Sequence, residues 1–256
     1  MARGEQSALV EIIEAEGSTP REKGALMLVS AEQSFGTIGG GQLEFHAIDK
    51  AREMLDAGGQ NLELLLHLGP HMGQCCGGRV KLKLWRAGAA DLARLSAAEA
   101  RSAEKMPQIQ IFGAGHTGKA LARQLALLPF KTQLIDEREE VFFDFSGSKF
   151  VPEAQKSVDF VQKCPEKSAF VVLTHSHALD YAIAEAALKR GDAAYVGMIG
   201  SATKRARFAS WFLASGGSQA QLSKLTCPIG GADVIDKRPE IIAALTVAEL
   251  IRVFAG

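Results

Sequence analysis

Two patterns of apolar positions divide this sequence into halves of different character. In the first half, short apolar runs bounded by glycine and polar residues predict strands, and residues 8–14 fit either a strand or a short helix. The other strands are expected at residues 24–30, 34–38, 62–68 and 80–84. Apolar positions at helical spacing over residues 43–55, followed by Gly58 and Gly59, predict one helix. The first half is therefore expected to form a small α+β domain.

In the second half, buried strand patterns alternate with helical ones. Strands are expected at residues 108–112, 132–136, 170–173 and 195–199. Helices are expected at residues 117–128, 179–190 and 239–254. This alternation predicts a parallel sheet with crossover helices, so the whole chain is placed in the α/β class.

A stretch rich in Ala and small charged residues separates the two patterns and fits a solvated helix or a tether. We therefore expect an N-terminal α+β domain at residues 1–88, a linker at residues 89–106 and a parallel-sheet domain at residues 107–256.

Composition narrows the classes of function. The 29 basic and 29 acidic residues cancel, which argues against nucleic acid or a membrane surface as a partner. The sequence shows no signal peptide and no apolar run of about 18 residues, so a cytoplasmic protein is expected. Its four cysteines form neither a disulfide framework nor a paired C-x-x-C zinc motif.

A dinucleotide-type fingerprint opens the second half. A buried strand runs into Gly113, Gly115 and Gly118 in the pattern G-x-G-x-x-G, which predicts a Rossmann-like domain. Gly113 fits the tight turn, Gly115 a close approach to a pyrophosphate, and Gly118 close packing of helix on strand. Asp136, at the end of the next strand, is the expected acceptor for a ribose 2′-OH, which favours NAD over NADP.

Two further motifs follow strands of this sheet. His175 and His177, with Asp180 nearby, could bind a metal or move a proton; alternatively, His177 or Asp180 simply caps a helix. Ser201 is the expected N-cap of another helix that has Lys204 and Arg205 in its first turn. Cations there oppose the helix dipole, which favours a bound phosphate, although a solvated basic face is the alternative.

The first half carries three glycine-rich motifs. A turn at residues 17–21 ends in Arg21, and a loop at residues 36–44 could cradle an oxyanion with free backbone N–H groups. The candidate residues of that loop are Gly39, Gly40, Gly41 and Glu44. The third motif holds Cys75 and Cys76 between glycines, ahead of Arg79, whose charge favours a reactive thiolate suited to a soft metal. Buried structural cysteines are the alternative.

The motifs together resemble the XdhC/CoxI family of molybdenum hydroxylase maturation factors over nearly the whole chain. In the first half they are G-S-T-P-R-E-K-G-A (17–25), G-T-I-G-G-G-Q-L-E (36–44) and G-Q-C-C-G-G (73–78). In the second half they are F-G-A-G-H-T-G-K-A-L (112–121), L-T-H-S-H-A-L-D (173–180), G-M-I-G-S-A-T-K-R (197–205) and C-P-I-G (227–230).

Within that family, the chain looks more like the xanthine dehydrogenase accessory branch than the CoxI branch. The features in favour are the G-T-I-G-G-G loop, the cysteine pair and the segment K-R-P-E-I-I-A-A at residues 237–244. The CoxI branch usually has S-G-G-C-V-E, with cysteine where this chain has Gln42, so a role for that cysteine does not carry over.

The resemblance implies a dimeric chaperone without turnover of its own. Such a protein binds the molybdenum cofactor (molybdopterin), protects it while a cysteine desulfurase installs the terminal sulfido ligand, and inserts it into apo-xanthine dehydrogenase. Cys75 and Cys76 would then lie near molybdenum, Arg21 and the glycine loop near oxo groups or pterin, and Lys204 and Arg205 near phosphate. Two other functions stay open, an NAD-dependent oxidoreductase that uses His175, His177 and Asp180, and a structural assembly scaffold.

Overall fold

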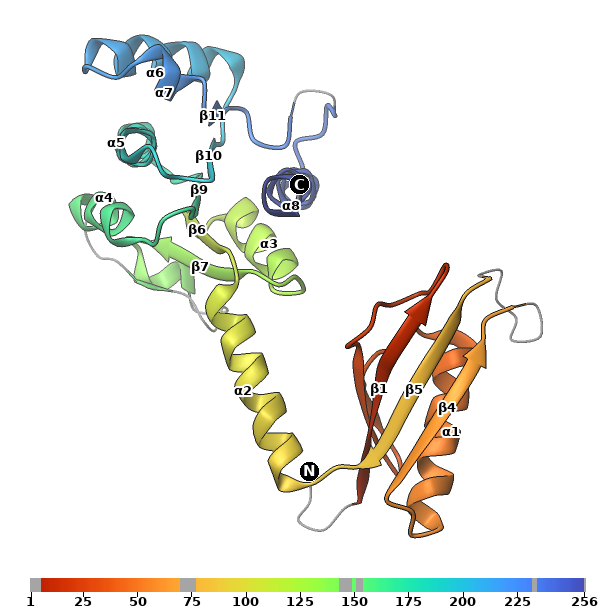
Figure 1. Cartoon of the computed structure of the whole chain (residues 1–256). Helices are drawn as coiled ribbons and strands as arrows, with labels where there is room; N and C mark the ends of the chain where they lie inside the picture. Colours follow the sequence, from red (N-terminus) through yellow and green to blue (C-terminus); the bar gives the residue numbers. More distant parts are fainter. Residues whose placement is uncertain (1–5, 70–76, 143–148, 151–153, 232–233, 256) are drawn as a thin grey trace. The chain divides into compact units, whose positions relative to one another are not determined.

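The computed structural model describes residues 6–69, 77–142, 149–150, 154–231 and 234–255. The chain forms two compact units, residues 1–99 and residues 100–256, and each is described by itself (Figure 1).

The first unit is an antiparallel five-stranded sheet in the order β3-β2-β1-β5-β4. Its strands are β1 (Ser7–Glu16), β2 (Leu26–Ser30), β3 (Ser34–Gly36), β4 (Asn61–His67) and β5 (Arg79–Arg86). Helix α1 (Gly41–Asp56) buries Leu43, Ala47 and Ala51 against inward-facing residues such as Val10 and Leu82. Alternate residues of β5 are buried, as expected for a sheet with a helix on one face only.

Helix α2 (Ala89–Lys105) leads into the second unit, a parallel six-stranded sheet in the order β11-β10-β9-β6-β7-β8. The strands are β6 (Gln108–Phe112), β7 (Lys131–Asp136), β8 (Lys149–Phe150), β9 (Ala169–Val172), β10 (Tyr195–Met198) and β11 (Leu225–Thr226). If these six strands are numbered 1 to 6 by their order in the chain, the sheet has the order 6-5-4-1-2-3. This is the doubly wound Rossmann order, in which the direction of strand order reverses between β6 and β9. The expected α/β class with a Rossmann-like second domain is thereby confirmed.

Helices cover both faces of this sheet. Helices α3 (His116–Leu125) and α8 (Pro239–Ala255) pack together on one face. Helices α4 (Ala154–Lys163), α5 (His177–Arg190) and α6 (Ala202–Ala214) belong to the other, with the short α7 (Gln219–Leu222) beside them (Figure 1). Strands β9 and β10 are buried over their whole length, which matches the apolar runs seen in the sequence.

Several elements of the second unit were not expected from the sequence: α4, α7, β8, β11 and the 3₁₀ turn η2 (Glu139–Phe142). In the first unit, residues 8–14 form a strand and not a short helix. No helix in the described part of the chain is long and apolar enough to cross a membrane.

Candidate functional site

The fingerprint glycines lie at the point where the strand order reverses. A Cβ on Gly113, whose φ is +113°, would lie 2.2 Å from the carbonyl oxygen of Leu173 at the end of β9. A Cβ on Gly118 would lie 1.9 Å from the carbonyl oxygen of Gly113. Both glycines therefore permit close backbone packing, as the sequence predicted. Gly115 is different, because a Cβ there meets nothing within 4 Å and the space beside the start of α3 is open.

Asp136 ends β7 as expected, but its carboxylate is already fully engaged. Oδ2 accepts hydrogen bonds from the Ala114 N–H at 2.7 Å and the Arg138 Nη2 at 2.9 Å. Oδ1 accepts from the Arg138 N–H at 3.0 Å and its Nε at 2.9 Å. Burial opposes ionisation, but these donors outweigh it and hold the pKa of Asp136 below its ordinary value. Four donors saturate the carboxylate in this conformation, so the ribose contact predicted for Asp136 has no free lone pair.

The anion that compensates Lys204 belongs to the protein. The Nζ atom of Lys204 lies 2.5 Å from Oδ2 of Asp180 and donates to the carbonyl oxygen of Ile199 at 2.9 Å. Asp180 is fully buried and also accepts from the Thr174 N–H and hydroxyl, both at 2.8 Å. The interpretation that a first-turn cation favours a bound phosphate is therefore corrected for Lys204, because Asp180 supplies the charge.

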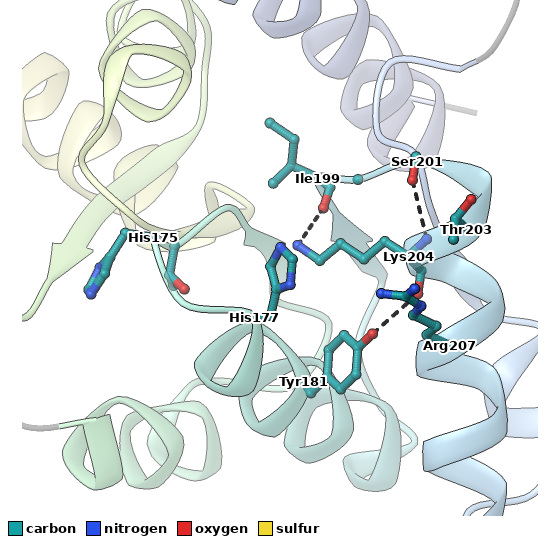
Figure 2. A pocket seen from close by; sticks show the side chains of 10 residues that line it. His175, His177, Tyr181, Ile199, Ser201, Thr203, Lys204 and Arg207 are labelled. Carbon is teal, nitrogen blue, oxygen red and sulfur yellow. Dashed lines mark hydrogen bonds between the residues drawn. The ribbon is translucent and has the colours of Figure 1, made fainter.

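A cleft of about 410 Å³ opens beside this ion pair, beyond the carboxyl ends of β9 and β10 (Figure 2). Its lining residues are Thr174, His175, His177, Tyr181, Ile199, Gly200, Ser201, Thr203, Lys204 and Arg207. Figure 2 shows His177 beside the end of the Lys204 side chain, whereas His175 points away from the other labelled residues. The cleft thus combines cations, hydroxyls and one imidazole.

The cleft cation that sequence reasoning missed is Arg207. Arg205, the predicted candidate, is exposed but does not line the cleft, whereas Arg207 does. The sequence could have indicated Arg207, because residues three apart share a helix face and Arg207 follows Lys204 by three positions. Ser201 does cap α6 as predicted, accepting the Lys204 N–H at 3.3 Å.

The histidines do not form the expected metal or capping arrangement. Ser176 caps α5 through its side chain, so neither His177 nor Asp180 is the cap. His175 Nε2 lies 3.4 Å from Oε1 of Glu137, at the end of β7. Among the described residues, no group of three or more His, Cys, Asp or Glu side chains could hold a metal ion.

In the first unit, the three glycine-rich motifs converge at one end of the sheet. Glu16 ends β1 opposite Arg79, which begins β5, and a Cβ on Gly78 would lie 2.4 Å from the carbonyl oxygen of Ser18. A Cβ on Gly39 would lie 2.6 Å from Cγ of Pro20. The first turn, the glycine loop and the end of the cysteine motif are therefore in direct contact, although they lie far apart in the sequence.

The amides of the glycine loop are not all free, which corrects the proposed oxyanion cradle. Oε2 of Glu44 accepts the N–H groups of Ile38 at 3.2 Å and Gly40 at 3.0 Å, and the hydroxyl of Thr37 at 2.6 Å. The Gly39 N–H donates to the Thr37 hydroxyl at 3.0 Å. Glu44 therefore holds the loop closed from within, while Gly41 begins α1.

Two exposed cations at this end of the sheet, Arg21 and Lys23, line a cleft of about 490 Å³ formed by residues 20–25, together with the carboxylate of Glu22. Arg79 is instead paired with Glu16 through two hydrogen bonds of 2.9 Å, which raise the pKa of Arg79 and compensate its charge. The argument that Arg79 promotes a thiolate is weakened accordingly. Cys75 and Cys76 themselves lie outside the described residues.

Comparison with known proteins agrees with this arrangement. Residues 109–250 match the family model of the XdhC Rossmann domain, and residues 1–69 match that of the XdhC and CoxI family. The chain belongs to the XdhC and CoxI family. The uncharacterized protein YqeB of Escherichia coli (strain K12) is 25% identical to this family member over 257 residues, which is 96% of this chain. The chain spans only 43% of the length of that relative.

A solved structure described as a xanthine dehydrogenase from Bacillus halodurans has the same fold. The similarity covers 99% of this XdhC and CoxI family member and 93% of the solved chain, with a TM-score of 0.78 and 19% sequence identity. At that identity the likeness establishes the fold but not a shared activity.

Proposed function

We propose that this protein is a maturation factor for xanthine dehydrogenase-type enzymes, of the xanthine dehydrogenase accessory branch. It binds the molybdenum cofactor, holds it without turnover of its own and delivers it to the apoenzyme. Family membership supports the general role. The single observation that carries the binding step is the convergence of the three glycine-rich motifs at one end of the first unit's sheet.

The residues at that end suit an anionic, oxygen-rich ligand. Arg21 and Lys23 line an open cleft and outnumber the one carboxylate there, Glu22. Their turn rests against Gly39 through Pro20. Guanidinium groups bind oxyanions through paired N–H donors, which a flexible lysine does not reproduce. Arg21 is therefore the residue we assign to the oxo or pterin oxygen atoms of the cofactor.

Cys76 and Cys75 lie outside the described residues and precede Gly78 in the sequence by two and three positions. Thiolates are soft ligands that suit a molybdenum centre or its sulfur ligands. When bound, the cofactor supplies the redox-active metal that the target enzyme needs. In this proposal the protein shields that group while a cysteine desulfurase modifies it, and a homodimer is the expected assembly.

The test is the cofactor content of the full chain purified from cells that synthesise the cofactor. We expect molybdenum and pterin in the wild-type protein, and a decrease of about tenfold in Arg21→Ala, because a charged hydrogen bond contributes about 1.5–3 kcal/mol. Arg94→Ala is the matched control, since Arg94 is 58% exposed on α2, which follows the opposite end of β5. Cys75→Ala and Cys76→Ala, singly and together, should lose cofactor while keeping their melting temperature.

The other two functions predict different results in the same experiment. An NAD-dependent oxidoreductase would show nicotinamide-dependent turnover, and a structural scaffold would carry neither cofactor nor activity. Equal molybdenum content in Arg21→Ala, the cysteine variants and Arg94→Ala would contradict the proposed binding site. A lack of molybdenum and pterin in the wild-type protein would contradict the proposed function itself.

A further inference from the structure

Two of the hollows in the second unit lie beyond the carboxyl ends of its central strands, and they differ greatly in size. The dinucleotide side, beyond β6 and β7, retains a cavity of only about 10 Å³ among residues such as Gly113, Asp136 and His175. That volume is the space of about one water molecule. The cleft beyond β9 and β10 has about 410 Å³, within the range of small-molecule sites.

The side chains of Glu137 and His175 border the smaller cavity. Strand β6 lies between β7 and β9 in the sheet, and Glu137 and His175 follow those two flanking strands. Their 3.4 Å contact therefore spans the carboxyl end of β6, where a dinucleotide would cross. Asp136 beside them is saturated by Ala114 and Arg138. The space directly beyond β6 is therefore largely filled, although Glu137 and His175 also border a hollow of about 320 Å³ that residues of α4 and α5 line.

The larger cleft has unused donors. An ammonium group carries three N–H donors, and Lys204 uses one on Asp180 and one on Ile199, which leaves a third for the cleft. The Arg207 guanidinium lines the cleft, and no hydrogen bond or ion pair is found for it among the described residues. Ser201 and Thr203 add hydroxyls.

The charge of the cleft selects for an anion. None of its lining residues is a carboxylate, and the nearby Asp180 is fully buried and paired with Lys204. The cleft also receives the N-terminal turn of α6, a helix of 13 residues whose first amides lack intrahelical acceptors. The Arg207 charge, the remaining N–H donor of Lys204, two hydroxyls and a helix start together form a suitable environment for a phosphate group.

We propose that this cleft is a binding site for a small ligand that carries a phosphate monoester, held by Lys204, Arg207, Ser201 and Thr203. The ligand does not extend across β6, so the domain binds no dinucleotide in this conformation. The phosphate monoester of a mononucleotide and that of a pterin present the same chemistry to these groups. The inference goes beyond the proposed function and does not require molybdenum.

The test is calorimetric titration of the full chain with AMP, adenosine, inorganic phosphate and NAD. AMP should bind at least about tenfold more tightly than adenosine, because the charged contacts go to its phosphate. NAD, which lacks a phosphate monoester, should bind more weakly than AMP. Arg207→Ala should weaken AMP binding about tenfold at an unchanged melting temperature, whereas its neighbour Arg205→Ala, outside the cleft, should match the wild type.

A second arm identifies the source of the phosphate monoester. Wild type and Arg207→Ala are purified from cells that make pterin cofactor but receive no molybdate, and bound pterin is measured by fluorescence after oxidation. Pterin that is retained by the wild type and lost from Arg207→Ala supports the site with a pterin ligand, even if AMP fails to bind. The proposal is overturned if neither AMP nor pterin depends on Arg207, or if NAD binds more tightly than AMP. Because no arm uses molybdenum, these results are distinguishable from failure of the proposed function.

Discussion

The ammonium group of Lys204 lies 2.5 Å from the carboxylate of Asp180, whose side chain is fully buried. This pair joins the start of α6 to the first turn of α5, and so fixes the two helix N-termini that flank the cleft. The same carboxylate holds the Thr174 N–H and hydroxyl at the end of β9. Asp180 is therefore the residue that organises this edge of the sheet.

Removal of Asp180 alone should be costly. Asp180→Asn leaves Lys204 without its anion, and we expect the free energy of unfolding to fall by about 3–5 kcal/mol. The double variant Asp180→Asn/Lys204→Met should lose less than the sum of the two single variants, because it leaves no uncompensated charge. Urea denaturation of the four proteins gives the coupling energy, and strictly additive losses would contradict the assigned pair.

The fingerprint glycines provide a matched pair of substitutions. Gly118→Ala places a methyl group against the Gly113 carbonyl, and we expect a loss of about 1–3 kcal/mol from overpacking. Gly115→Ala meets no atom within 4 Å and should cost only about 0.5 kcal/mol, through a poorer N-cap. Thermal unfolding of both variants is the measurement. Similar melting temperatures would show that Gly118 does not have the close contact described.

Asp136 should make the second unit sensitive to acid. Its pKa is lowered in the folded protein, so its contribution to stability is present at neutral pH and is lost as the pH falls below about 4. Asp136→Asn should lower the free energy of unfolding at pH 7 by about 1.5–3 kcal/mol, the range for a hydrogen bond to a charged group. Stability measured between pH 7 and pH 3 should then fall less steeply in the variant than in the wild type. If the stability of the variant and of the wild type fell in parallel as the pH was lowered, the Asp136–Arg138 pair would be excluded as the cause of the acid sensitivity.

Glu44 should stabilise the glycine loop from within. Glu44→Ala removes the acceptor of three hydrogen bonds, and we expect a loss of about 2 kcal/mol together with a lower cofactor content. Glu53→Ala on the same helix is the control, because the exposed Lys50–Glu53 pair contributes under about 1 kcal/mol. Chemical denaturation and molybdenum analysis of both variants check this, and equal stability would argue against an internal anchor.

The sequence predicted those parts of the fold that local patterns encode. Buried β-rich runs identified β6, β9 and β10, and helical spacing identified α1 and α5. Strand β11 has only two residues, too few to show a period. The start of α6 was predicted from its Ser201 N-cap, but its basic and aromatic positions form no clear apolar stripe from which to predict its length.

The location of the candidate site was predictable from the sequence, but the ion-pair partners of its cations were not. Gly113 and Gly118 follow a local motif, and their packing roles agree with it. The partners of Lys204 and Arg79 lie 24 and 63 residues away, at distances that no local pattern reports. Sequence reasoning therefore assigned a phosphate to Lys204 and a thiolate to Arg79, whereas the fold pairs these cations with Asp180 and Glu16.

Transfer of the cofactor to the target enzyme tests the central claim most directly. The full chain is purified from cells that make the molybdenum cofactor and from cells that do not, and each preparation is incubated with apo-xanthine dehydrogenase. Our account predicts that xanthine oxidation appears only with the first preparation, in proportion to the molybdenum it carried, and is reduced in Arg21→Ala. Equal activation by both preparations, or none by a molybdenum-loaded protein, would contradict it.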